Sequence, residues 1–206
     1  MVKIKTIFLF FFLLLPLLAV AGSSLDDLVV FVGEKISVKK FEPKSDPDTF
    51  LMDEAFKARY KVLELVHGEF GGKEIEFEAY DHYGRPEFSR YKTVLLFVSK
   101  YEEGMYHQKY QFFPVFKTND GYWAGCGSPY AYEPEVHHGD LNPIAHSFSK
   151  NAYFPLKRLS RKERKQYFPK EYYKIVKKRA YCLKGNTVDE LFEVKLNGVL
   201  KARGME

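Results

Sequence analysis

Much of the chain alternates between apolar and polar side chains with the period of two that is typical of β-strands. Residues 56–62 place apolar side chains between cations, and residues 75–79 place them between glutamates. A glycine-containing turn at 68–72 separates the two runs, and the alternation slips near Leu63, which indicates a β-bulge. We therefore predict a hairpin in which cations face glutamates across the sheet: Lys57, Arg59 and Lys61 against Glu74, Glu76 and Glu78.

Further strands are predicted on both sides of this hairpin. Residues 28–38 are apolar and β-branched, with Gly33 inside the run, and residues 92–101 form a continuous apolar run that is typical of a strand buried on both faces. Residues 105–117 are strand-like, and Pro114 within them indicates an edge strand or a bulge. These runs predict a mainly β fold of the α+β class. We expect a small curled antiparallel sheet or a small barrel of about five strands, with a helical segment towards the C-terminus.

The second half of the chain gives weaker signals. Residues 127–156 show no periodicity and are predicted to be an irregular loop. Residues 160–180 contain a capping box, Ser160 with Glu163, and an interruption at Pro169, so we predict two short helices, the second beginning at the proline. Residues 190–203 alternate again and are predicted to form a C-terminal strand.

The first 21 residues have the three zones of a cleavable export signal. Lys3 and Lys5 form a positive start, residues 7–18 are apolar apart from Pro16, and small residues follow. The alternative is a retained membrane anchor, but a spanning helix needs ~20 apolar residues and this run is shorter. We predict cleavage between Ala21 and Gly22, and a secreted or periplasmic protein with no transmembrane helix in its mature chain.

The chain contains two cysteines, Cys126 and Cys182. In an exported protein a single pair of cysteines predicts a disulfide. Two alternatives stay open from the sequence: both residues could be free thiols, or Cys126 could be a nucleophile, since His137, His138 and Asp140 follow it and a thiol nucleophile needs a base within reach.

The charge of the chain is unevenly distributed. The net charge is +5, yet residues 157–181 alone contain eleven Lys and Arg residues against Glu163 and Glu171. A concentrated positive charge attracts polyanions. The predicted contacts are Lys174, Lys177, Lys178 and Arg179, with anionic lipid, acidic polysaccharide or a protein as partner, and nucleic acid is not expected. The alternative is a solvated face that docks against the acidic remainder of the chain while its tyrosines face the core.

Imidazole and carboxylate side chains gather between residues 133 and 146. They are the ligand types of zinc, and His137, His138 and Asp140 are the metal-ligand candidates, although their spacing matches no established metal motif. No Gly-x-Ser-x-Gly elbow, phosphate-binding glycine loop or calcium-loop pattern occurs in the chain. We therefore identify no catalytic residue and predict no cofactor.

Five segments of residues 28–126 carry a resemblance to a known group of domains. In order they are VFVGEKISV, FKARYKVLELVHGEF, KEIEFEAYDH, VLLFVSKY and GYWAGC. This series resembles the OB-type barrel of netrin-module and metalloproteinase-inhibitor-like domains, and it implies a barrel. The inhibitory members of that group begin their mature chain with a zinc-gripping cysteine, whereas this mature chain is expected to begin with Gly22. The resemblance therefore bears on fold more than on activity.

Together these patterns predict a single exported domain over residues 22–206. Its parts are a barrel-like core (28–126), the irregular loop (127–156) and a basic helical segment followed by a C-terminal strand (157–206). The favoured function is an exported, non-enzymatic binding or envelope-associated protein. The alternatives are a metal-dependent hydrolase built on the His/Glu/Asp-rich loop and a secreted protein resembling protease inhibitors.

Overall fold

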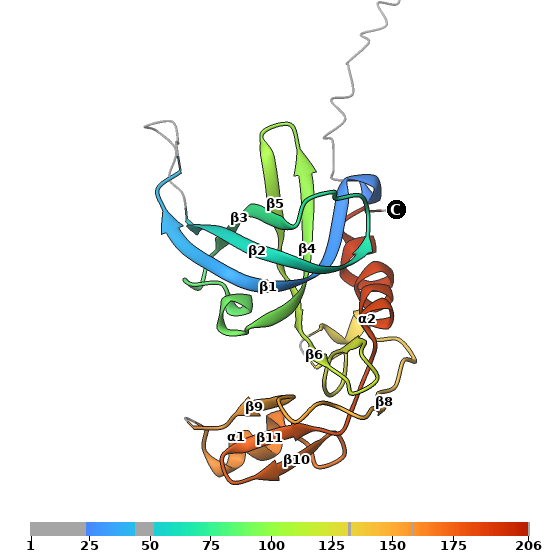
Figure 1. The fold of residues 1–206 in the computed structure, drawn as a ribbon. Helices are drawn as coiled ribbons and strands as arrows, with labels where there is room; N and C mark the ends of the chain where they lie inside the picture. Colours follow the sequence, from blue (N-terminus) through green and yellow to red (C-terminus); the bar gives the residue numbers. More distant parts are fainter. Residues whose placement is uncertain (1–23, 44–51, 132, 158, 206) are drawn as a thin grey trace, which may run out of the picture.

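Five strands curl into a closed barrel, the upper body of the molecule in Figure 1. The computed structural model describes residues 24–43, 52–131, 133–157 and 159–205. The strands close in the order β1-β2-β3-β5-β4. Their bounds are β1 (Leu28–Phe41), β2 (Glu54–His67), β3 (Glu74–Asp81), β4 (Thr93–Tyr101) and β5 (Gly104–Pro114).

The barrel confirms the predicted fold class, a mainly β protein with a short helical part near the C-terminus. The expectation of a purely antiparallel sheet is wrong at one place. Strands β3 and β5 run parallel where Glu78 pairs with Tyr106, and this contact closes the barrel. The other pairs of neighbouring strands in the barrel are antiparallel.

The predicted hairpin is present with the predicted register. Strand β2 pairs with β3 so that Lys57 lies opposite Glu78, Arg59 opposite Glu76 and Lys61 opposite Glu74. The predicted bulge also lies where the alternation slips: Val32 pairs with Glu64 and Gly33 with Val62, so Leu63 has no partner of its own. The period of two therefore fixes both the faces and the register of this hairpin.

The barrel interior is filled by aromatic rings. Phe31, Tyr60, Phe77 and Phe88 are almost fully buried there, and their ring centroids lie about 6 Å apart. On the outside, helix α2 (Val188–Lys195) and the π-helix η4 (Leu196–Leu200) cover β1 and β4 (Figure 1). Residues 94–98 of β4 are therefore buried on both faces, as the continuous apolar run predicted.

The predicted C-terminal strand over 190–203 is wrong, because this segment is helical. Thr187 and Glu190 form a capping box that starts α2. Leu191, Phe192 and Lys195 are buried at the spacing of one helix face, and the same segment contains Val194, which also fits a strand pattern. The helical cap and the apolar stripe decide the structure here.

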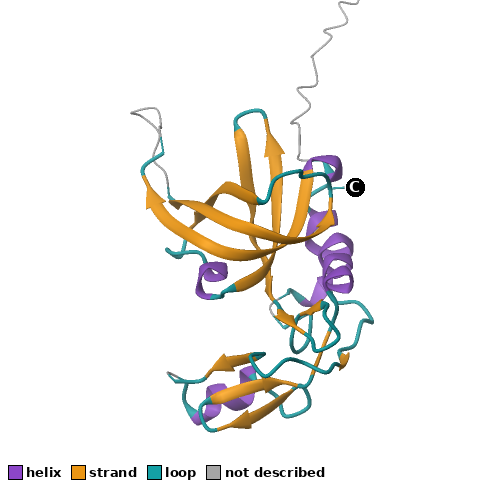
Figure 2. Ribbon diagram, viewed as in Figure 1, coloured by secondary structure: helices purple, strands orange, loops and turns teal. Residues whose placement is uncertain are grey.

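The lower body is built around a small sheet in the order β10-β11-β9 (Figure 2). Its strands are β9 (Tyr153–Pro155), β10 (Tyr173–Val176) and β11 (Arg179–Cys182), and helix α1 (Arg161–Tyr167) lies beside them. The capping box of Ser160 and Glu163 that starts α1 is confirmed. The second predicted helix is wrong: after Phe168 and Pro169 the chain turns and forms the hairpin β10–β11.

The segment 173–182 forms a hairpin and not a helix because several of its residues have a high propensity for β-strands. Tyr173, Ile175 and Val176 are aromatic or β-branched, and Tyr173 is buried with Ala180 and Leu156 in a core of its own. Lys177 takes a positive φ of 54° at the turn. The many cations between residues 173 and 182 interrupt the period of two, so the sequence pattern did not indicate strands here.

The remaining elements are short, and several of them lie between the two bodies. They are β6 (Phe116–Lys117), β7 (Trp123–Ala124), β8 (Ile144–Ala145), β12 (Lys184–Gly185) and the 3₁₀ turns η1 (Leu25–Asp27), η2 (Glu87–Arg90) and η3 (Glu135–His137). The predicted disulfide is present, with an S–S distance of 2.15 Å between Cys126 and Cys182. It links β11 to the segment after β7. The Tyr173 hydroxyl donates to the Cys126 carbonyl at 2.7 Å beside it.

The predicted export signal, residues 1–21, and its cleavage position between Ala21 and Gly22 lie outside the described residues. Among the residues that are described, no helix has the length and apolar character needed to cross a bilayer.

We expect reduction of the disulfide to loosen the lower body more than the barrel. A bridge that closes a loop of this length stabilises a fold by about 2–4 kcal/mol. Hydrogen exchange with and without reductant tests this. Amides of β10 and β11 should exchange faster after reduction, while those of β1 and β4 keep their protection. Equal acceleration in both bodies would contradict the assignment.

The barrel also contains a histidine that sets a pH dependence. The His107 ring packs against Phe77 and Phe88, with centroids 6.1 and 4.6 Å away, and its Nε2 donates to the Gln111 carbonyl at 2.8 Å. Burial among these rings lowers the pKa of His107 from 6.5 to about 4. Between these two pH values the unfolded chain binds a proton at this residue and the folded protein does not.

The free energy of unfolding should therefore fall as the pH drops from 6.5 towards 4, by up to about 3 kcal/mol from this residue alone. Denaturant titrations at pH 7 and pH 4.5 test this on the wild type and on His107→Gln, in which the amide can still donate to Gln111. The variant should lose less stability over this interval than the wild type. An identical loss in both proteins would show that His107 is not its source.

Candidate polyanion-binding cleft

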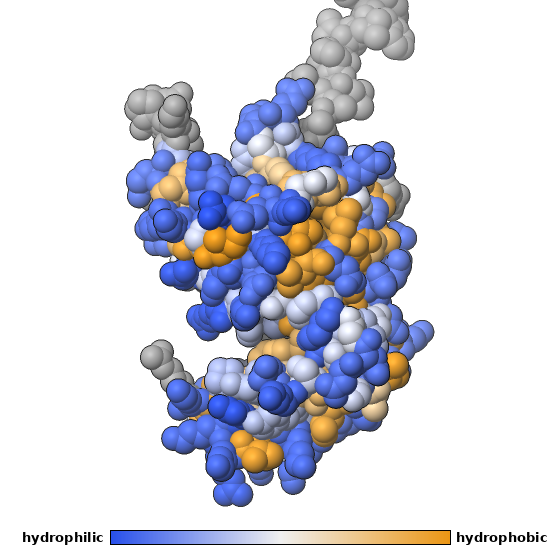
Figure 3. All heavy atoms as spheres, in the orientation of Figure 1, coloured by the Kyte–Doolittle hydropathy of each residue, from blue (hydrophilic) through white to orange (hydrophobic). Residues whose placement is uncertain are grey.

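A cleft separates the barrel from the lower body. In Figure 3 it is the hollow between the two bodies on the left of the molecule, and its volume is about 1250 Å³. One wall comes from the end of η2, the start of β4 and the chain that leaves β5. The other wall comes from β9 and the hairpin β10–β11. The two walls therefore meet only because the fold brings distant segments together.

The lining of this cleft carries positive charge only. Seven cations line it, and no aspartate or glutamate does. Three of them stand on the barrel side and four on the side of the lower body: Arg90, Lys92 and Lys117, and Lys157, Lys177, Lys178 and Arg179. Cations that converge on one concave surface raise the local concentration of anions.

Most of these cations are not paired with carboxylates. Lys92 lies 2.9 Å from Glu34 and Arg90 lies 3.0 Å from Glu87. The hydrogen bond from Lys92 lowers the pKa of Glu34. Within the described part of the chain, the other five have no carboxylate oxygen within 4.0 Å. Their charge is therefore available to a ligand.

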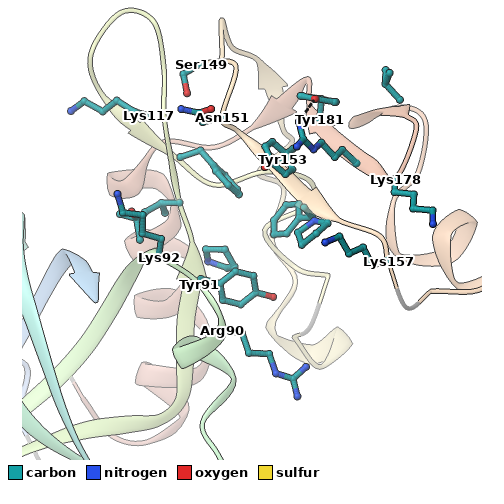
Figure 4. Close-up of a pocket in the computed structure, with 18 of the residues that line it drawn as sticks. Arg90, Tyr91, Lys92, Lys117, Ser149, Asn151, Tyr153, Lys157, Lys178 and Tyr181 are labelled. Atoms are coloured by element: carbon teal, nitrogen blue, oxygen red, sulfur yellow. Dashed lines mark hydrogen bonds between the residues drawn. The ribbon is translucent and has the colours of Figure 1, made fainter. Parts of the chain in front are cut away.

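Aromatic rings alternate with the cations along the cleft, as Figure 4 shows for Tyr91, Tyr153 and Tyr181. The Arg179 guanidinium lies 4.4 Å from the centre of the Tyr153 ring and donates to the Tyr181 hydroxyl at 3.3 Å. This hydrogen bond raises the pKa of Arg179. Lys117 lies 4.6 Å from the centre of the Trp123 ring. Rings and cations at this spacing can contact a sugar face and its acidic group together.

Phe154 of β9 packs against aromatic rings from both walls of the cleft. Its ring centroid lies 6.1 Å from that of Tyr91 and 5.1 Å from that of Phe116, on the barrel side. On the other side it lies 5.6 Å from Phe168 and 6.1 Å from Tyr173. One ring thus joins the apolar clusters of both bodies at the base of the cleft.

Three of the four predicted contact residues line the cleft: Lys177 and Lys178 at the hairpin turn and Arg179 at the start of β11. Lys174 does not; it is exposed on β10 and lies outside the cleft lining. The predicted set also lacked Lys157, which belongs to the basic segment, and three cations of the barrel side: Arg90, Lys92 and Lys117. The three barrel-side cations stand singly or as one of two among aromatic and hydroxyl side chains in the sequence, so no local signal marks them.

The hypothesis that the basic segment docks on an acidic surface is not supported at the cleft, because the opposite wall is also basic. The tyrosines of the segment divide between two environments. Tyr173 is buried, as that hypothesis expected, whereas Tyr167 is 45% exposed.

The metal-ligand candidates do not converge. His137 Nδ1 lies 3.7 Å from a Glu133 carboxylate oxygen, His138 Nε2 contacts the Glu133 carbonyl at 3.1 Å, and Asp140 is exposed. Glu133 itself pairs with the buried Lys195 of α2. Among the described residues, no group of three His, Cys, Asp or Glu side chains is arranged to hold a metal ion.

The other residues considered for chemistry have structural partners. His146 contacts the Tyr122 hydroxyl at 2.9 Å through Nδ1 and the Gly185 carbonyl at 3.1 Å through Nε2. The sulfur of Cys126 is bonded to Cys182, so in this structure it is not a free nucleophile. The two contacts of His146 connect the segment 127–156 to Tyr122 and Gly185.

Comparisons with known proteins were made at the level of families, sequences and structures. No family model, curated protein or solved structure matches this chain. The function therefore has to be argued from the cleft itself.

Proposed function

We propose that this protein is an exported, non-enzymatic binding protein that holds an acidic polysaccharide in the basic cleft. The observation that carries the proposal is the lining of the cleft: seven cations on two facing walls, with aromatic rings between them and no carboxylate. This combination suits a ligand that repeats negative charge along its length and presents flat apolar faces between the charges.

The shape of the cleft favours a chain over a membrane surface. A bilayer is broad and nearly flat, so it could touch the rims of the cleft but could not reach cations on both inner walls. A single polysaccharide strand can enter the cleft, place carboxylates against both walls and stack sugar rings on Tyr153 and Tyr181. Single-stranded nucleic acid shares the stacking and the charge, and it is one arm of the test below.

Export is part of the proposal. It is supported by the disulfide, which persists in oxidising compartments, and by the apolar opening stretch of the sequence. The closed barrel of five strands supplies one wall of the cleft.

Neutralising the hairpin side of the cleft should weaken binding of polygalacturonate. The variant is Lys177→Gln/Lys178→Gln/Arg179→Gln. Exposed charge contacts contribute roughly 0.2–1 kcal/mol each, so we expect an affinity loss of about tenfold, with a weaker dependence on salt than in the wild type. Isothermal titration with polygalacturonate at several salt concentrations measures both.

Two matched controls accompany this variant. Lys162→Gln/Lys165→Gln/Lys170→Gln removes the same charge from the lower body outside the cleft lining, and Lys174→Gln changes the predicted contact that lies outside it. Both should bind as the wild type does. Fully methyl-esterified polygalacturonate, which keeps the rings and lacks the charge, should bind weakly. Equal losses in the cleft and control triple variants, or tighter binding of single-stranded DNA than of polygalacturonate, would overturn the proposal.

A further inference from the structure

A second cavity opens beside the basic cleft, between the barrel mouth and helix α1. Its volume is about 890 Å³, within the range of small-molecule sites. Rings and aliphatic side chains make up most of its wall, from η2 and β5 on one side and the chain around α1 on the other. Its apolar wall includes Phe88, Phe112, Leu159 and Phe168.

The cavity and the cleft share one wall. Five residues line both: Arg90, Tyr91, Phe154, Pro155 and Lys157. Two of them are cations, Arg90 on the barrel side and Lys157 on the side of the lower body. A ligand in the apolar cavity would therefore meet positive charge at the end of the cavity that adjoins the basic cleft.

The acidic groups of the cavity wall are already engaged. The Asp81 carboxylate accepts from the Tyr83 backbone N–H at 2.9 Å, and Glu87 lies 3.0 Å from Arg90. Within the described residues, Lys157 has no carboxylate within 4.0 Å. An anionic headgroup at the exit would thus meet an available cation, while a cationic headgroup would meet like charge.

We infer that the cavity takes the acyl chain of an amphiphile whose acidic sugar headgroup lies at Arg90 and Lys157. This inference rests on the proposed function and narrows its ligand to an acidic glycan that carries a lipid chain. The charge at the shared wall selects the headgroup, and the apolar lining selects the chain. Transfer of an acyl chain from water into such an apolar cavity is favourable because it removes apolar surface from water.

The test uses two probes, dodecyl β-glucuronide and dodecyl β-glucoside, each as monomers in solution. They differ only at C6 of the sugar, which is a carboxylate in the glucuronide and a hydroxymethyl group in the glucoside. Wild-type protein should bind the glucuronide saturably and about tenfold more tightly than the glucoside, because only the former has a charge for Lys157. Lys157→Gln should reduce the glucuronide to the affinity of the glucoside. Equal binding of both probes by the wild type would overturn the headgroup assignment.

Two substitutions in the cavity wall test the cavity assignment, one that adds volume and one that adds negative charge. Leu159→Trp should weaken the glucuronide about tenfold and leave polygalacturonate unchanged, because Leu159 lines the cavity and not the cleft. Tyr167→Glu, at a cavity residue that is 45% exposed and therefore tolerant of substitution, should weaken the glucuronide in the same way. Circular dichroism checks that both variants are folded. Unchanged glucuronide binding in a folded variant would overturn the cavity assignment.

The two proposals fail in distinguishable ways. If wild-type protein binds polygalacturonate and shows no saturable binding of the glucuronide, the acyl-chain inference is wrong and the basic cleft keeps its proposed ligand. If it binds the glucuronide in a way that Leu159→Trp weakens but does not bind polygalacturonate, the cavity assignment stands and the polysaccharide proposal is wrong.

Discussion

The joint between the two bodies is the constraint on which the cleft depends. Cations on both walls face the same space, and like charges at short distance repel. The Phe154 ring packs against apolar side chains from both bodies at the base, and the Cys126–Cys182 bond ties β11 to the segment after β7. A cleft lined by cations on both walls needs such a joint, because repulsion between the walls would otherwise move them apart.

Local patterns in the sequence were enough to predict the strands of the first half of the chain, but they left open whether the sheet closes into a barrel. The alternation of residues 56–62 and 75–79 determines which side chains point inward, and the facing charges fix the register that the structure shows. The slip at Leu63 and the capping box at Ser160 are also local signals, and both are confirmed. Each of these features is decided by residues within a few positions of one another or across one tight hairpin.

The cleft and the C-terminal half could not be predicted in the same way. Arg90, Lys92 and Lys117 reach the cleft through the tertiary arrangement of η2, β4 and the chain after β5, and nothing in their neighbourhood distinguishes them from ordinary surface cations. The errors in the secondary structure have a similar origin. Cations interrupt the strand pattern around Tyr173, and Val194 lies on a helix whose buried stripe also satisfies an alternating pattern. Packing against β1, β4 and β9 decides both segments.

The distribution of acidic residues explains why the cleft keeps its charge. The glutamates of β3 already face cations of β2, and Arg59 lies 3.5 Å from Glu74 within that sheet. These glutamates are thus paired within the barrel sheet, and the cations at the β10–β11 turn face the cations of the barrel wall instead. A monovalent anion would neutralise one wall at most. A polymer with repeating carboxylates can engage both walls at once, and each contact after the first benefits from the high effective concentration of the tethered charge.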